Sequence, residues 1–208
     1  MVSIMVKLIA IDGADGSGKT IISQHLQEHL KSKGKKALII EYPRNTFFGN
    51  IASKLLVAGR NRSDSETAVI PLLLAFSYAV DFLFSTVSYR FKKGADTIIF
   101  VRYTLTLAYL PERIGTILFI FFTKLLPAPD IGIYVKVSEE IALSRFDQVH
   151  EKELPQITEN PILLQSVNKK MEKLSKLSSH PKWQELNNDG DLETLFQQVE
   201  EIYDNSHL

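Results

Sequence analysis

The chain has 208 residues, which is enough for one domain with a sizeable core and too few for two comfortable ones. Its 24 basic and 24 acidic residues cancel, and this neutral balance argues against a general nucleic-acid binder, which usually carries a basic excess. The sequence contains no Cys, which excludes a disulfide framework and a Cys-ligated metal site and suits a cytoplasmic protein.

The N-terminus carries a short apolar run that leads directly into a glycine-rich loop. This order predicts a first strand at Lys7–Ile11 rather than a signal peptide. The loop reads GADGSGKT and fits the phosphate-binding pattern G-x-x-x-x-G-K-[ST] without a gap, between a strand and a helix. The expected ATP-binding residues are therefore Gly13, Ala14, Asp15, Gly16, Ser17, Gly18, Lys19 and Thr20.

This loop has the chemistry that a nucleotide needs. Its glycines let the backbone approach a ligand closely, and its successive N–H groups form an anion nest with the helix N-terminus. Lys19 can reach the β- and γ-phosphates, and Thr20 can supply a hydroxyl to Mg²⁺. The alternative is a glycine turn that binds nothing, and the match of both motif and context favours nucleotide binding. Asp15 either faces a hydroxyl of a second substrate or is a solvent-facing turn residue.

Helices and strands are expected to alternate along the rest of the chain. The helix Lys19–Lys33, which stops at Gly34, is followed by the strand Ala37–Glu41, a long and mostly apolar helix at Ser65–Arg90 and the strand Thr97–Val101. The most apolar stretch, Ile114–Leu126, is too short to span a bilayer and is interrupted by Lys124. It predicts a buried or partner-facing helix, and no membrane association.

The C-terminal third continues the alternation. The expected elements are the strand Ile131–Val137, the helix Ser138–Phe146, a mobile polar surface loop at Asp147–Asn160, the helix Pro161–Ser178, a weaker strand Trp183–Leu186 and the helix Asp191–Asp204. Strands rich in Ile, Val and Leu that alternate with helices indicate an α/β fold with a mainly parallel sheet covered on both faces.

Several segments, in order, resemble the thymidylate kinase family, whose members phosphorylate dTMP with ATP. They are IDGADGSGKT around the phosphate loop, EYPRN at Glu41–Asn45, VRYTLTLAY at Val101–Tyr109 and PDIGIYVKVSEEIALSRF at Pro129–Phe146. The resemblance covers nearly the whole chain. It implies one P-loop NTPase domain over residues 1–208 with a five-stranded sheet, a lid at about 147–160 and a homodimer, for which Ser65–Arg90 could supply the interface.

The resemblance also implies roles for individual residues. Lys19 and Thr20 would handle the ATP phosphates and Mg²⁺, and Asp15 would contact the sugar 3′-hydroxyl of the monophosphate. Arg44 would stabilise charge on the transferring phosphoryl group, and Arg102 would hold the phosphate of the acceptor. The nucleoside pocket would be lined by Tyr103 and Tyr109.

Three features depart from the family's pattern. Val101 replaces the acid that normally precedes Arg-Tyr and helps to place magnesium, and Asp12 is a nearby acid that nothing in the sequence shows to be a substitute. Tyr78 and Ala79 stand where an Asp-Arg pair is expected. The lid is poor in arginine, because Arg145 is the last Arg of the chain and Lys152 is the only Lys or Arg of the loop.

These departures leave three functions open. The first is transfer of the γ-phosphoryl group of ATP to dTMP, the second is the same reaction on a different nucleoside monophosphate, and the third is a non-catalytic nucleotide-binding protein that acts through partners. A nucleic-acid role is not expected, because the Lys-rich segment Lys169–Lys176 is typical of a solvated helix face. His25 and His29, one helical turn apart, predict an exposed helix face rather than a metal site.

Overall fold

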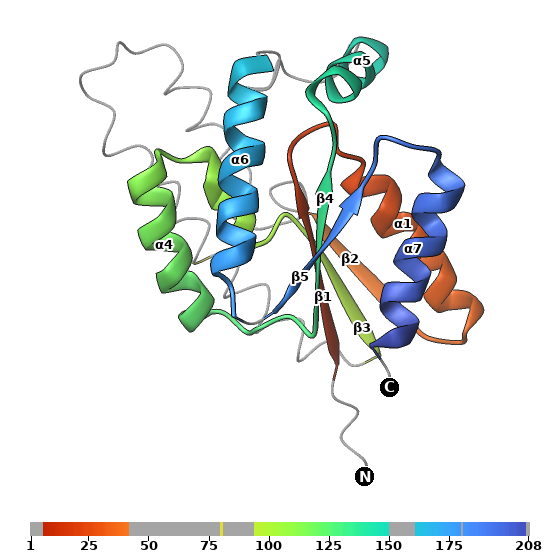
Figure 1. Cartoon of the computed structure of the whole chain (residues 1–208). Coiled ribbons are helices and arrows are strands. Elements are labelled where there is room, and N and C mark those ends of the chain that lie inside the picture. The colour runs from red at the N-terminus through yellow and green to blue at the C-terminus, as the bar shows by residue number, and fades with distance from the viewer. Residues whose placement is uncertain (1–5, 42–79, 81–93, 150–160, 180, 207–208) are drawn as a thin grey trace.

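The computed structural model describes residues 6–41, 80, 94–149, 161–179 and 181–206. Five strands form one sheet in the order β2-β3-β1-β4-β5, and every neighbouring pair is parallel (Figure 1). The strands are β1 (Lys7–Gly13), β2 (Ala37–Glu41), β3 (Thr97–Val101), β4 (Ile131–Lys136) and β5 (Trp183–Asn187). All five expected strands are confirmed, and the parallel sheet with helices between its strands is the predicted α/β fold.

Helices cover both faces of the sheet (Figure 1). One face carries α1 (Lys19–Ser32) and α7 (Leu192–Asn205), which contact each other. The other face carries a 3₁₀ helix η1 (Thr104–Tyr109), α4 (Glu112–Leu125) and α6 (Pro161–Leu177). A further helix, α5 (Glu139–Val149), follows β4 at the carboxyl end of the sheet.

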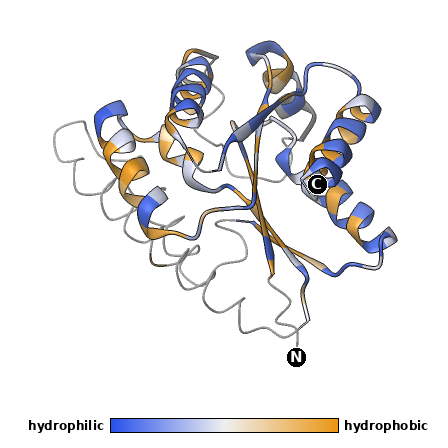
Figure 2. Ribbon diagram, turned by 60° about the horizontal axis from the view of Figure 1, so that its bottom comes forward, coloured by the Kyte–Doolittle hydropathy of each residue, from blue (hydrophilic) through white to orange (hydrophobic). Residues whose placement is uncertain are grey.

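The central strand β1 separates two apolar cores. Successive side chains of a strand point to opposite faces, so Ile9 and Ile11 pack with α1 and α7, whereas Leu8 and Ala10 pack with η1, α4 and α6. Because both faces are covered, the strand has no polar face, and this explains its nearly continuous apolar sequence. In Figure 2 the strands run between helices of mixed hydropathy.

One predicted boundary is wrong. The loop expected at Asp147–Asn160 begins too early, because α5 continues through Val149. Residues 147–149 include no Gly or Pro that would end the helix. The rest of the predicted lid, 150–160, lies outside the described residues, as does the predicted helix Ser65–Arg90 apart from Val80, which is helical.

The apolar helix α4 has two different faces. Gly115, Phe119 and Phe122 are buried against the core, as predicted for this stretch. The opposite face is exposed within the described part of the chain and carries Ile117, Ile120, Phe121 and Leu125. No helix among the described residues is both long enough and apolar enough to cross a membrane.

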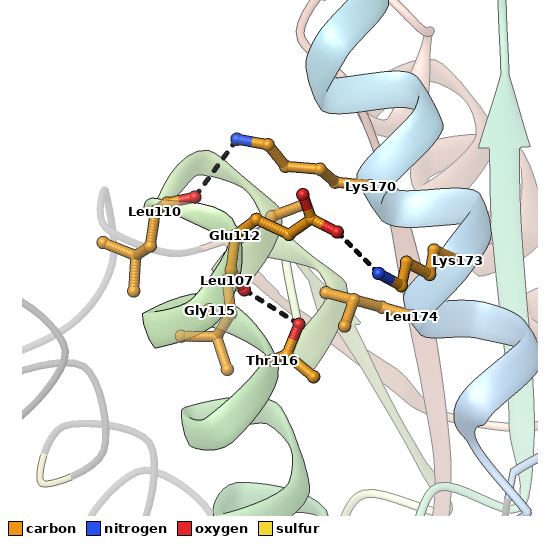
Figure 3. A pocket seen from close by; sticks show the side chains of 9 residues that line it. Leu107, Leu110, Glu112, Gly115, Thr116, Lys170, Lys173 and Leu174 are labelled. Atoms are coloured by element: carbon orange, nitrogen blue, oxygen red, sulfur yellow. Dashed lines mark hydrogen bonds and ion pairs between the residues drawn. The ribbon is translucent and has the colours of Figure 1, made fainter.

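The junction of η1, α4 and α6 fixes the segment that follows β3 (Figure 3). A Cβ atom at Gly115 would lie 2.6 Å from the Leu107 carbonyl oxygen, so glycine permits the close approach of α4 to η1. The Lys173 ammonium lies 2.5 Å from the Glu112 carboxylate and lowers its pKa. Lys170 donates a hydrogen bond to the Leu110 carbonyl. This junction holds η1 in place, and Tyr109 is the last residue of η1.

Candidate active site

The phosphate loop connects β1 to α1 in a conformation that requires glycine. Gly16 and Gly18 have φ angles of 75° and 90°, in the left-handed region that other residues rarely adopt. A Cβ atom at Gly13 would overlap the Val135 carbonyl oxygen of β4. The loop is closed by a hydrogen bond of 3.2 Å from the Ser17 amide to the Ala14 carbonyl. The predicted loop and its place before a helix are therefore confirmed.

Lys19 is folded into this loop. The residue is 5% exposed, and Nζ donates a hydrogen bond of 2.5 Å to the Ala14 carbonyl. Burial lowers the pKa of the Lys19 ammonium to about 8, against the opposing effect of the Asp15 carboxylate 3.9 Å away. The group is still mostly protonated at neutral pH. A phosphate placed in the loop would supply the negative charge that the buried ammonium lacks.

A polar network braces the outside of the loop. Arg145 of α5 donates to the Gly16 carbonyl at 3.2 Å and to the Asn188 carbonyl at 3.0 Å. Asn188, immediately after β5, donates through Nδ2 to the Ser17 carbonyl at 2.7 Å and is 1% exposed. The sequence analysis identifies Arg145 only as the last arginine of the chain and does not predict this contact. Asn188 is not predicted as a site residue, because its one local feature is that it is a polar residue after a strand.

Asp12 anchors the segment that follows β3. Its carboxylate is completely buried and accepts hydrogen bonds from the Tyr103 amide at 3.0 Å and the Leu105 amide at 2.9 Å. It also accepts one of 2.8 Å from the Thr106 hydroxyl. Three donors thus engage this carboxylate. The acid that immediately precedes the loop is thus engaged in holding the segment that carries Arg102.

The buried carboxyl group of Asp12 should make the free energy of unfolding depend on pH. Burial raises its pKa from 3.8 to about 6, so the folded chain binds this proton more tightly than the unfolded chain. The stability contributed by Asp12 is therefore full below about pH 4 and is lost as the pH rises through about 6. Relative to an Asp12→Asn variant, we expect the free energy of unfolding of the wild type to fall by up to about 3 kcal/mol between pH 4 and pH 7.

Urea unfolding of both proteins at these two pH values measures this difference directly. The Asn variant is the matched reference, because its side chain has a similar shape and does not titrate. A difference between the two proteins that stays constant, or that grows in favour of the wild type as the pH rises, would contradict the buried-acid account.

Arg102, Asp15 and Tyr109 meet beside the phosphate loop. Nη2 of Arg102 donates to the Asp15 carboxylate at 2.6 Å, and the Asp15 amide donates to the Tyr109 hydroxyl at 3.0 Å. Both Asp15 and Arg102 are at most partly exposed. Residues predicted from two separate segments, the phosphate loop and Val101–Tyr109, are thus brought together at the carboxyl end of the sheet, where ligands bind in α/β proteins.

The backbone of Arg102 is strained. Its φ angle is 69°, which is the only positive value among the described residues other than glycine. The strained conformation is held from both sides, because the Arg102 amide donates to the Ile11 carbonyl at 2.9 Å and Asp12 binds the next amide along the chain. Strain of this kind persists where the surrounding structure over-determines it, and it clusters at functional sites.

Tyr103 is buried in the core, whereas Arg102 and Tyr109 contact Asp15. It is 5% exposed, belongs to the core beneath α4 and α6, and its hydroxyl donates to the Pro127 carbonyl. These contacts are those of a core residue, and the place predicted for Tyr103 in a nucleoside pocket stays a prediction. Arg44, Tyr78, Ala79 and Lys152 lie outside the described residues.

The prediction of an exposed face for the two histidines of α1 is wrong. His25 and His29 face α7, where their ring nitrogens lie 2.8 Å and 3.3 Å from the Glu200 carboxylate. The His29 side chain is 11% exposed. Helix α7 covers this face because its own apolar residues must pack on the sheet. Among the described residues, no group of three or more acidic or His side chains could hold a metal ion.

Comparisons with known proteins point to one family. A family model described as thymidylate kinase matches residues 11–199. The probable thymidylate kinase 1 of Saccharolobus solfataricus is 34% identical over 147 residues, which are 68% of this chain and 70% of that one. The thymidylate kinase of Thermosipho africanus is 30% identical over 185 residues, which are 81% and 84% of the two chains.

A solved structure matches in fold. The thymidylate kinase of Candida albicans superimposes with a TM-score of 0.69 at 18% sequence identity, over 98% of this chain and 94% of that chain. A five-stranded parallel sheet with a phosphate loop after its central strand defines a P-loop NTPase fold. The chain belongs to the thymidylate kinase family. It is an ATP-dependent nucleoside monophosphate kinase, and the predicted family resemblance is confirmed.

Proposed function

We propose that this enzyme transfers the γ-phosphoryl group of ATP to dTMP, with Mg²⁺, and so produces dTDP. The observation that supports the proposal most strongly is the meeting of Lys19, Asp15 and Arg102 at one end of the sheet. Two cations and one acid at this point suit two phosphate-bearing substrates, because one loop can hold ATP while an arginine beside it holds the acceptor.

The phosphate loop would bind the donor. Its amides and the N-terminus of α1 would hold the β- and γ-phosphates, and the Lys19 ammonium would leave the Ala14 carbonyl to meet them. The Thr20 hydroxyl and the carboxylate of Glu41, 3.4 Å apart, are oxygen donors of the kind that Mg²⁺ prefers. Bound Mg²⁺ would neutralise the charge of the transferring phosphoryl group.

Arg102 and Asp15 would receive the acceptor. A guanidinium group binds phosphate through two parallel hydrogen bonds, so the phosphate of dTMP would compete with the Asp15 carboxylate for Arg102. The released carboxylate could then accept a hydrogen bond from the 3′-hydroxyl of the sugar, while Tyr109 keeps the Asp15 backbone in place. Arg44 would add positive charge at the transferring group, from a segment outside the described residues.

The proposal extends to the state of the protein in the cell. The family resemblance supports a homodimer built on the apolar segment Ser65–Arg90, and a single domain with a lid at about 147–160. The absence of Cys suits a place in the cytoplasm. Size-exclusion chromatography with light scattering tests the homodimer. A dimer of about twice 23.5 kDa is expected, and a monomer at micromolar concentration would contradict it.

An acceptor panel tests the choice of dTMP. ADP release with ATP and Mg²⁺ is measured for dTMP, dUMP, dCMP, dGMP, dAMP and UMP, with ATP alone as the control for hydrolysis. We expect the highest kcat/KM with dTMP. A higher value with another monophosphate would assign the enzyme to that acceptor, and no release with any of them would remove the kinase assignment for this chain.

A further inference from the structure

The carboxyl end of β2 carries an acid beside the position where β3 carries Val101. Glu41 and Val101 are paired in the β2–β3 register and therefore lie at the same level of the sheet. The Val101 side chain is apolar and 1% exposed, so it offers no ligand to an ion. A carboxylate that is absent from the end of β3 is thus present one strand away, at the same edge of the sheet.

The carboxylate of Glu41 faces the phosphate loop. Its Oε1 atom accepts a hydrogen bond of 3.4 Å from Oγ1 of Thr20. Thr20 is the last residue of the loop motif, and its hydroxyl is the one that the motif assigns to Mg²⁺. The negative charge of Glu41 also acts on the neighbouring ammonium, where it raises the pKa of Lys19 against the larger effect of burial.

The two other acids near the loop are engaged by donors of their own. The carboxylate of Asp12 accepts three hydrogen bonds from the segment after β3. The carboxylate of Asp15 pairs with Arg102 at 2.6 Å. Among the described acids, Glu41 is the one whose carboxylate contacts the Thr20 hydroxyl.

The spacing of the two oxygens suits an octahedral ion. Adjacent oxygen ligands of Mg²⁺ at its usual bond length are about 3 Å apart. The oxygens of Thr20 and Glu41 are 3.4 Å apart, so a shift of about half an ångström, or a water in place of one direct bond, accommodates the ion.

We propose that Glu41 is the magnesium-positioning residue of this enzyme and that it binds the ion, or one of the waters on the ion, together with Thr20. It takes over the role of the acid that is missing at position 101. This inference rests on the proposed function, because the ion arrives with ATP. It explains how a chain with Val101 at the end of β3 keeps a working metal site.

Mn²⁺ binding to the complex of the full chain with ATP, measured by electron paramagnetic resonance, tests this role. Glu41→Gln is the informative variant, because its amide oxygen can still accept the Thr20 hydrogen bond while its charge is lost. We expect the Mn²⁺ affinity of the complex to fall about 10- to 100-fold, which is the usual loss when a group that supports a metal is replaced. Glu41→Asp should retain part of the affinity.

Two controls separate this role from a structural one. ATP affinity in EDTA, measured with a fluorescent ATP analogue, should change less than about twofold in Glu41→Gln, since the loop itself is intact. Glu185→Gln, the same charge change on the exposed face of the opposite edge strand, should leave Mn²⁺ binding unchanged.

The possible failures are distinguishable. Unchanged Mn²⁺ affinity in Glu41→Gln would overturn the role of Glu41, while ATP binding and transfer to dTMP by the wild type would leave the proposed function standing. Equal losses of ATP affinity with and without metal would also overturn it, because they indicate a damaged loop. A wild type that binds no ATP would remove both proposals.

Discussion

Replacing Lys19 with Met should reduce kcat by roughly 10²- to 10³-fold, the usual loss when one group that stabilises transition-state charge is removed. The side chain of Lys19 is the one cation that the described loop itself contributes, and it lies buried among the groups that would surround the phosphates. Met keeps the length of the buried stem and removes the charge together with the hydrogen bond to the Ala14 carbonyl. A coupled ADP-release assay at saturating ATP and dTMP measures the change.

Loss of the fold does not explain such a result if thermal stability is preserved. Burial lowers the pKa of Lys19 to about 8, so at neutral pH its charge costs free energy in the folded state. The melting temperature of Lys19→Met should therefore equal or exceed that of the wild type. Lys31→Met, on an exposed turn of the same helix, should keep full activity. Turnover of Lys19→Met within about threefold of the wild type would contradict the assignment.

Replacing Arg102 with Gln should raise the KM for dTMP by roughly 10- to 100-fold. Hydrogen bonds between a guanidinium and a phosphate contribute about 1.5 to 3 kcal/mol, and each tenfold change in affinity corresponds to about 1.4 kcal/mol. The KM for ATP should change much less, since the loop does not depend on the guanidinium. Arg102→Lys should recover only part of the loss, because an ammonium cannot form the two parallel hydrogen bonds.

Arg113→Gln provides the control for this experiment, since it removes an exposed arginine from α4 without touching the site. The two KM values are measured separately, each with the other substrate at saturation. An equal rise of both values in Arg102→Gln, or a rise in that for ATP alone, would show that Arg102 supports the donor site and not the acceptor.

The sequence predicts the sheet well for a physical reason. Strands covered on both faces must be apolar throughout, and such short runs between turn signals are easy to recognise. The bounds of β2 and β3 agree with the prediction at every residue. The phosphate loop is equally predictable, because its glycine positions and its Lys-Thr pair are fixed by the approach of the backbone to phosphate.

The partners of the site residues could not be derived from the sequence. Asp12 meets donors from the segment after β3, and Asn188 meets a loop near the other end of the chain. These contacts depend on the strand order, which brings distant segments to the same edge of the sheet. No local pattern encodes them. The end of α5 differs from the prediction for another reason. A polar composition is typical of a loop, but residues 147–149 contain no helix breaker, and the helix continues through Val149.

Glu41 shows both what the sequence predicts about the site and what only the fold reveals. The sequence reveals the loss of an acid at position 101, and it places Glu41 at the end of a strand. Only the register of β2 with β3 shows that the two positions are neighbours. A departure from a family's pattern at one position therefore does not imply loss of the chemistry, because a neighbouring strand can present the same group at the same edge.

Transfer of labelled phosphate is the most direct test of the central claim. ATP carrying a labelled γ-phosphoryl group is incubated with the enzyme, Mg²⁺ and dTMP, and the nucleotide products are separated by chromatography. We predict that the label appears in dTDP, at a rate that Lys19→Met reduces. Label that remains in ATP, or that appears only as free phosphate, would contradict the account of this chain as a kinase of dTMP.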